Sequence, residues 1–269
     1  AVPGPHGAGR GGCILAGRHA IRTTAAPSAP PLRYTGGGRF IDEERPAAQG
    51  ERGQMTATAW TEDERAGAAI VGTSLAPFFL EDPRLGAAGP SFDAMAALDA
   101  HAAAAEWPFV DEDGALECLQ LIQEGLAAGV DDDLMWEYRR LFVGPGHKAA
   151  PPWGSVYTDR ECVMFGLTTL DLRQWMRERG IERLGDANDP EDHIGLMLEL
   201  MAWLAGNRPE DLDDYLRLHL LTWAPHFLEY LEDASTHPFY RGLARLTRLS
   251  LEGIRDARGL DVAVPRFYK

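Results

Sequence analysis

Residues 141–161 read LFVGPGHKAAPPWGSVYTDRE and join two segments that both have helical patterns. Three of these residues are prolines, which fix their own backbone φ angle and donate no backbone hydrogen bond. We therefore expect a stiff loop that holds Trp153 and Tyr157 at the surface at a small cost in entropy. Long irregular loops within helical domains are often functional. The alternative is that the loop is a structural corner in which the Trp153 side chain is buried in the core.

Helical patterns continue on both sides of this loop. Residues 61–64 form a capping box at the start of one helix, and residues 131–133 place acidic groups at the start of another. Pro190, after a cap at Asn188 or Asp189, is expected to begin a further helix. Strand signals are absent, since there is no NG or DG hairpin and no sustained alternation. The remaining helices are expected at residues 169–179, 209–222, 225–234 and 237–256, with a break near Pro225.

The fold class predicted from these patterns is all-α, a single-domain helical bundle spanning residues 56–256. Residues 1–55 differ in composition, because Gly and Pro supply 17 of the 55 positions. Such a segment buries too little apolar surface to offset the entropy of ordering, so it is expected to be a disordered extension. We also hypothesise that Met55 is the translational start. Residues 257–269 are expected to be a peripheral tail.

The charge is strongly asymmetric along the chain. The net charge is -15, whereas residues 1–55 carry seven arginines against four acidic residues, so the remainder is near -18. The strongly acidic remainder of the chain argues against nucleic acid as a partner and is compatible with a cationic partner. There is no apolar run long enough to span a bilayer and no secretory signal pattern, so membrane insertion is not expected. Three scattered cysteines favour a reducing compartment, and the cytoplasm is the default.

The sequence lacks the motifs of the common catalytic and metal sites. No HExxH and no Cys/His cluster with ligand spacing occurs, so no metal is expected. Residues 144–148 are not a phosphate-binding loop, because the spacing is wrong and no Ser or Thr follows Lys148. No nucleophile has an evident base. We therefore expect a protein that is not an enzyme and needs no cofactor.

Two constellations could bind a ligand. Glu191, Asp192 and His193 fall in the expected first helical turn after Pro190, where the helix dipole favours carboxylates and a neutral imidazole. Asp192 and Glu191 could accept hydrogen bonds from a guanidinium, or they could simply cap the helix.

The second constellation is apolar and aromatic. Tyr138, Leu141 and Phe142 share one helix by spacing, and the loop can fold Trp153 and Tyr157 near them. This set is either a groove for an apolar peptide or part of the core. Leu141 and Phe142 are adjacent, so they are not expected to point the same way.

At these residues the chain resembles the TorD/DmsD family of maturation chaperones, and its DmsD-like members most closely. The signature runs through YxxLF at residues 138–142, GPG…APPWGSVYTDRE at 144–161, FG…TLDLRQWMRERGI at 165–181 and NDPEDHIG at 188–195. HPFYRGLARL at residues 237–246 also fits. The resemblance covers about residues 56–256.

The resemblance implies an all-helical cytoplasmic protein that serves a molybdenum-cofactor oxidoreductase of the dimethyl sulfoxide reductase type. Its partners would be the twin-arginine signal peptide and the catalytic subunit of that oxidoreductase, which would be held back from export until its cofactor is loaded. The Tat translocase is a further implied partner. By matching motif, the implied peptide contacts are Tyr138, Leu141, Phe142, Pro152, Trp153, Tyr157, Gly166, Asp192 and His193, with Glu191 as a partner for arginine. Tyr138 and Tyr157 stand where the relatives carry Trp, and both changes keep a flat amphipathic ring.

Two other functions stay open at this point. One is a helical hydrolase or nucleotide-handling protein that uses His193 and nearby acids. The other is an adaptor that binds the mature body of the client, in the manner of a nitrate-reductase assembly chaperone. The sequence leaves open the client's identity, the oligomeric state, and whether a nucleotide or molybdenum cofactor binds.

Overall fold

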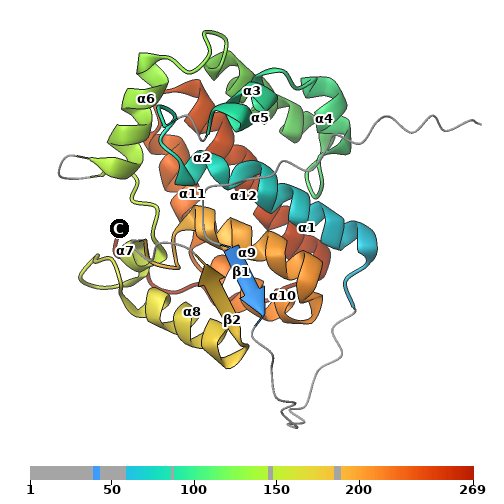
Figure 1. The fold of residues 1–269 in the computed structure, drawn as a ribbon, viewed down its shortest axis with the longest axis vertical. Coiled ribbons are helices and arrows are strands. Elements are labelled where there is room, and N and C mark those ends of the chain that lie inside the picture. The colour runs from blue at the N-terminus through green and yellow to red at the C-terminus, as the bar shows by residue number, and fades with distance from the viewer. Residues whose placement is uncertain (1–38, 43–58, 86–87, 145–147, 185–188) are drawn as a thin grey trace, which may run out of the picture. The chain divides into compact units, whose positions relative to one another are not determined.

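The computed structural model describes residues 39–42, 59–85, 88–144, 148–184 and 189–269 (Figure 1). Most of these residues are helical, which confirms the predicted class. In chain order the elements are β1 (Arg39–Asp42), α1 (Glu62–Leu75), α2 (Pro77–Leu80), α3 (Gly89–Ala96), α4 (Ala100–Glu106), α5 (Glu112–Gly125), α6 (Asp132–Tyr138), the π-helical turn η1 (Arg139–Val143), α7 (Gly154–Thr158), α8 (Leu167–Glu178), β2 (Ile181–Leu184), α9 (Ile194–Asn207), α10 (Pro209–Tyr215), the π-helical turn η2 (Leu216–Leu220), α11 (Ala224–Ala234) and α12 (Pro238–Arg258). Within the described residues, no helix combines the length and apolar character needed to cross a bilayer.

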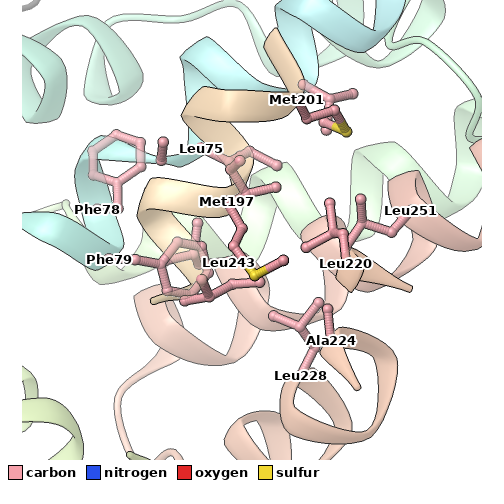
Figure 2. Close-up of a cluster of buried hydrophobic side chains, with 14 of the residues drawn as sticks. Leu75, Phe78, Phe79, Met197, Met201, Leu220, Ala224, Leu228, Leu243 and Leu251 are labelled. Carbon is pink, nitrogen blue, oxygen red and sulfur yellow. The ribbon is translucent and has the colours of Figure 1, made fainter. Parts of the chain in front are cut away.

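Helix α9 runs through the core of the bundle. It packs against α1, α2 and α10, while α12 packs against α5, α11 and α1. Figure 2 shows where side chains of α1, α2, α9, η2, α11 and α12 meet. The labelled members are Leu75, Phe78, Phe79, Met197, Met201, Leu220, Ala224, Leu228, Leu243 and Leu251.

The surroundings of α9 explain its composition. The sequence predicts one apolar face on this helix, made of Ile194, Met197, Leu198, Met201 and Leu204. Leu196 and Leu200, which lie off that face, are buried as well. A helix that is apolar all round is one that neighbours cover on every side. The approach of α1 is close, because a Cβ atom on Gly72 would lie 2.4 Å from the carbonyl oxygen of Leu198. A glycine is therefore required where the two helices cross.

Several predicted helix ends are confirmed. Thr61 caps α1, and the Thr61 and Glu64 side chains each accept a hydrogen bond from the other residue's backbone N–H, as in a capping box. Helix α8 ends at Glu178, close to Gly180, which has a left-handed φ of 64°. The break near Pro225 is also found, because η2 ends at Leu220 and α11 begins at Ala224.

A small sheet is the main departure from the predicted fold. Strand β1 pairs antiparallel with β2, so that Phe40 lies opposite Arg183. The Phe40 side chain is buried, and its ring lies 6.4 Å from that of Trp203. Four-residue strands are too short to give an alternating signal, and β1 falls within residues 1–55, for which disorder was expected. The prediction is wrong for residues 39–42, while the rest of that segment, Met55 included, lies outside the described residues.

The last residues also have a defined course. Helix α12 extends to Arg258 and ends at Gly259, which has a φ of 59°. Residues 260–269 then run without regular secondary structure and reach α7, where the backbone N–H of Tyr268 donates to the carbonyl oxygen of Tyr157 over 2.9 Å. The C label beside α7 in Figure 1 marks this end of the chain. The expected peripheral tail thus has a specific seat on the bundle.

Candidate functional site

The two motifs that the sequence singles out meet at the start of α7. Trp153 and His193 form an isolated antiparallel bridge. Its backbone hydrogen bonds are Gly154 N to Asp192 O at 3.0 Å and Ile194 N to Pro152 O at 2.8 Å. The Pro-Pro-Trp corner and the acidic run are therefore joined in space. They meet inside the molecule, since the Trp153 side chain is 5% exposed and that of Asp192 is 1% exposed.

Asp192 is hydrogen-bonded entirely within the protein. Its carboxylate accepts from Ser155 N at 2.7 Å, from Thr168 Oγ1 at 2.9 Å and from Thr169 Oγ1 at 2.7 Å. The expected placement in a first helical turn is wrong, because α9 begins only at Ile194. Asp192 instead ties the start of α7 to the start of α8. Its carboxylate is not presented to an external guanidinium.

Glu191 is already paired with a guanidinium of the chain. Arg173 on α8 donates from Nε to Glu191 Oε1 at 3.0 Å, and a second bond joins Nη2 to the other oxygen. Arg173 thus makes the bidentate contact with Glu191 that would be expected from an arginine of a ligand. An incoming arginine would have to displace Arg173 to use it.

His193 is the N-cap of α9. Its Nδ1 accepts a hydrogen bond from Gly195 N at 3.1 Å, so the neutral ring carries its proton on Nε2. Burial, with a smaller effect of Arg183, lowers the pKa of His193 to about 3. The ring is therefore neutral near pH 7, as the sequence predicts, although desolvation and not the helix dipole is the main cause.

This low pKa gives a prediction for stability against pH. In the unfolded chain histidine takes up a proton near pH 6.5, whereas the folded protein resists it down to about pH 3. Stability should therefore fall as the pH drops through this interval. His193→Asn keeps a capping side chain but does not titrate. We expect the difference in unfolding free energy between wild type and H193N to shrink from pH 7 to pH 4 in urea titrations. A constant difference would contradict a buried neutral ring.

Tyr157 is covered by aromatic side chains of α11 and of its N-cap residue, Trp223. Its side chain is fully buried, and its ring stacks 6.2 Å from Trp223 and meets Phe227 at 5.6 Å. Burial raises the pKa of the Tyr157 hydroxyl. The expectation that the loop holds Trp153 and Tyr157 at the surface is therefore wrong, and the alternative of a structural corner describes the geometry.

Tyr138, Leu141 and Phe142 are buried as well. Leu141 and Phe142 are both buried although they are neighbours in sequence, and they lie in the π-helical turn η1, which is closed by Gly144 N donating to Arg139 O at 2.7 Å. An unbroken series of ring contacts links this cluster to α7. It runs Tyr138–Phe142, Phe142–Phe79, Phe79–Phe227 and Phe227–Tyr157.

Pro152 and Gly166 complete the predicted set and are also buried. A Cβ atom on Gly166 would lie 2.7 Å from Asp159 Oδ2 and 3.0 Å from Ser155 Cβ. Gly166 therefore lets the loop before α8 lie flat against α7. The predicted residues are therefore buried, and the exposed apolar side chains on either side of Gly166 form a surface that the sequence did not predict.

That surface, which we call the apolar loop, comprises Val163, Met164, Phe165, Leu167 and Leu170. Their exposed fractions run from 36% for Met164 to 65% for Leu167. Phe165 has a φ of 61°, a backbone conformation that a bulky residue rarely adopts and that often marks functional sites. Sequence could have flagged this segment, because apolar residues crowd together without a helical period beside Glu161 and Asp171.

Two surface hollows lie elsewhere on the described part of the chain. One, of about 470 Å³, is lined by residues of α6 and the start of α12, including Trp136, Arg140 and His237. The other, of about 570 Å³, lies between α11, α12 and the last residues of the chain. Neither is lined by a predicted site residue. Among the described residues no group of three His, Cys, Asp or Glu side chains could hold a metal.

Comparison with known proteins places this chain in a family. Residues 111–229 match the family model described as nitrate reductase delta subunit. The chain is 41% identical over 166 residues to the Tat proofreading chaperone DmsD of Salmonella typhi, covering 61% of this chain and 79% of that protein. It is 44% identical over 140 residues to DmsD of Salmonella paratyphi A, covering 52% and 69%. The chain belongs to the TorD/DmsD family.

More distant TorD/DmsD members also match. The chaperone protein TorD of Vibrio cholerae serotype O1 is 29% identical over 158 residues, covering 54% of this chain and 70% of that protein. These relatives are named as chaperones and not as enzymes, which agrees with the expectation from the sequence and disfavours a hydrolase built on His193. The chain is thus a maturation chaperone of the TorD/DmsD type.

Proposed function

We propose that this chaperone binds the twin-arginine signal peptide of a molybdopterin oxidoreductase catalytic subunit in the cytoplasm and delays its export until the cofactor is loaded. The dimethyl sulfoxide reductase type of client is proposed from the resemblance that the sequence motifs carry, and the relatives named Tat proofreading chaperone support a client with a Tat leader. The observation that carries the proposal is the apolar loop.

The apolar loop has the chemistry of a docking surface for an apolar helical peptide. Its five large side chains fall within eight consecutive residues, and Leu167 and Leu170 lie three residues apart on α8. Residues with this spacing lie on one face of a helix. Exposed apolar side chains grouped in this way mark interaction surfaces on soluble proteins. The apolar run of a signal peptide is a ligand of matching character.

Acidic residues beside the loop suit the arginines of such a peptide. Glu161 and Asp171 are exposed, and they flank the apolar loop in sequence. The predicted acidic partners, Glu191 and Asp192, are engaged internally, so these exposed carboxylates are better placed to meet a guanidinium. Contacts between exposed charges weaken with salt. Binding of a twin-arginine peptide should accordingly weaken as ionic strength rises, and less so in the variant E161Q with D171N.

The proposal is tested by changing the loop without disturbing the fold. The variant F165N with L167S removes two exposed apolar side chains, and Asn tolerates the left-handed backbone at position 165. We expect its affinity for a labelled twin-arginine leader peptide, measured by fluorescence anisotropy, to fall by about tenfold or more, in line with the loss of two apolar contacts.

The matched control is L85S, since Leu85 is 64% exposed and Leu167 is 65% exposed. L85S should bind the leader as wild type does, and both variants should keep the wild-type helical circular dichroism. Equal leader binding by F165N/L167S and wild type would show that the loop is not the docking surface.

A second function is favoured by a specific observation. The matching family model is described as nitrate reductase delta subunit, which suits an assembly adaptor that holds the mature body of its client. Binding to a catalytic subunit lacking its leader discriminates the two. If the leaderless subunit binds as tightly as the full subunit, the adaptor function replaces the signal-peptide function.

A further inference from the structure

Residues 265–269 occupy a defined seat on α7 and α11. The Phe267 ring stacks on the His226 imidazole with 3.9 Å between centroids and 5° between planes. His226 Nε2 forms a hydrogen bond of 2.8 Å with the Lys269 carbonyl oxygen. With the bond from Tyr268 N to Tyr157 O, these contacts hold residues 267–269 against the two helices.

Cations lie over aromatic rings at this seat. The Lys269 ammonium lies 5.4 Å from the ring centroid of Tyr230, and the Lys148 ammonium lies 5.4 Å from that of Trp153. The Lys269 ammonium also donates to the carbonyl oxygen of Lys148 over 3.4 Å. Two aromatic rings near α7 therefore each lie close to a positive charge. A guanidinium fits such faces at least as well as an ammonium does.

The segment is nevertheless partly exposed. It has no regular secondary structure, and Val264 and Tyr268 are 69% and 42% exposed. The hollow of about 570 Å³ lies between it and the helices, with Pro225, Val262 and Phe267 among its lining residues. Segments with few buried contacts and few backbone hydrogen bonds open at low free energy compared with the core.

We propose that this seat is a binding site for short extended peptides in which cations accompany apolar or aromatic side chains, and that residues 265–269 are its internal occupant. The segment Arg266-Phe267-Tyr268-Lys269 has that composition, with a cation on each side of two aromatic residues. A twin-arginine leader combines the same two elements. This inference rests on the proposed function, in which the leader displaces residues 265–269 from the seat. Because these residues compete for the seat, they weaken the binding of peptides that fit it poorly.

The test uses one double variant, F267A with Y268P, in which residues 265–269 are released from their seat. F267A removes the stacking on His226, and Y268P removes the N–H that bonds to Tyr157. Ligand-observed NMR follows a synthetic peptide of residues 260–269, whose Phe and Tyr ring signals should broaden with the released variant and stay sharp with wild type. V264A, changed at an exposed position of the same segment, should behave as wild type.

The second measurement is leader binding by anisotropy. If the segment occupies its seat about nine-tenths of the time, its release should tighten leader binding about tenfold. The 260–269 peptide should also compete with the leader on the released variant. Failure of that peptide to bind the released variant overturns the seat, whatever the leader does. Binding of the peptide without competition overturns the link to the leader. Absence of leader binding by every variant overturns the proposed function alone, because the NMR result then stands by itself.

Discussion

Replacing Asp192 with alanine is expected to lower the free energy of unfolding by about 3 kcal/mol or more, because a buried carboxylate that accepts three hydrogen bonds is removed. The backbone N–H of Ser155 would lose its acceptor in the interior, and the hydroxyls of Thr168 and Thr169 would lose theirs. In a chain of this size the melting temperature should drop by roughly 6–12 °C. Urea unfolding followed by circular dichroism measures the loss.

Matched variants separate the structural role of Asp192 from a role in peptide contact. T168V and T169V each remove one of the three donors and should cost roughly 1 kcal/mol apiece. E191Q leaves the buried network intact and changes only the pair with Arg173. A stable D192A protein that had lost leader binding would show that Asp192 touches the ligand directly, against the geometry found here.

The second large effect is expected at the crossing of α1 and α9. Gly72→Ala places a methyl group 2.4 Å from the Leu198 carbonyl oxygen, and this backbone atom can retreat only if the helices separate. Overpacking of this kind costs roughly 1–3 kcal/mol and sometimes more, which outweighs the gain of about 0.5–1 kcal/mol from placing alanine in a helix. We expect G72A to be less stable by about 2 kcal/mol in the same urea assay.

The control for this prediction is Gly206→Ala, which makes the same chemical change within α9. A Cβ atom there meets nothing within 4 Å, and the position is exposed. G206A should therefore be neutral or slightly more stable than wild type. Equal stability of G72A and G206A would mean that the two helices do not cross as closely as the structure shows.

Much of the helical architecture could be predicted from sequence because its signals are local. The capping box at Thr61 is satisfied within one turn of the chain, and so is the helix end near Gly180. What could not be predicted depends on residues far away in sequence. Residues 181–184 form strand β2 because residues 39–42 pair with them. A sequence of four residues carries no signal for a partner that lies about 140 positions upstream.

The candidate site illustrates the same limit. The family motifs implied both Trp153 and His193 as peptide contacts, and the structure joins them in one backbone bridge. Burial, however, is decided by which helices cover a residue. Tyr157 lies inside because residues 223–230 and the last residues of the chain lie over it. The apolar loop has the composition of a core segment, so the sequence signal is its lack of a helical period, and the structure adds that no described element covers it.

The pairing of β1 with β2 has a consequence for association between molecules. Without residues 39–42, the backbone N–H and C=O groups along one side of β2 would be open to pairing with a strand of another molecule. Trp203 would also lose its contact with Phe40. We therefore expect that deletion of residues 39–42 would promote self-association of the protein through β2.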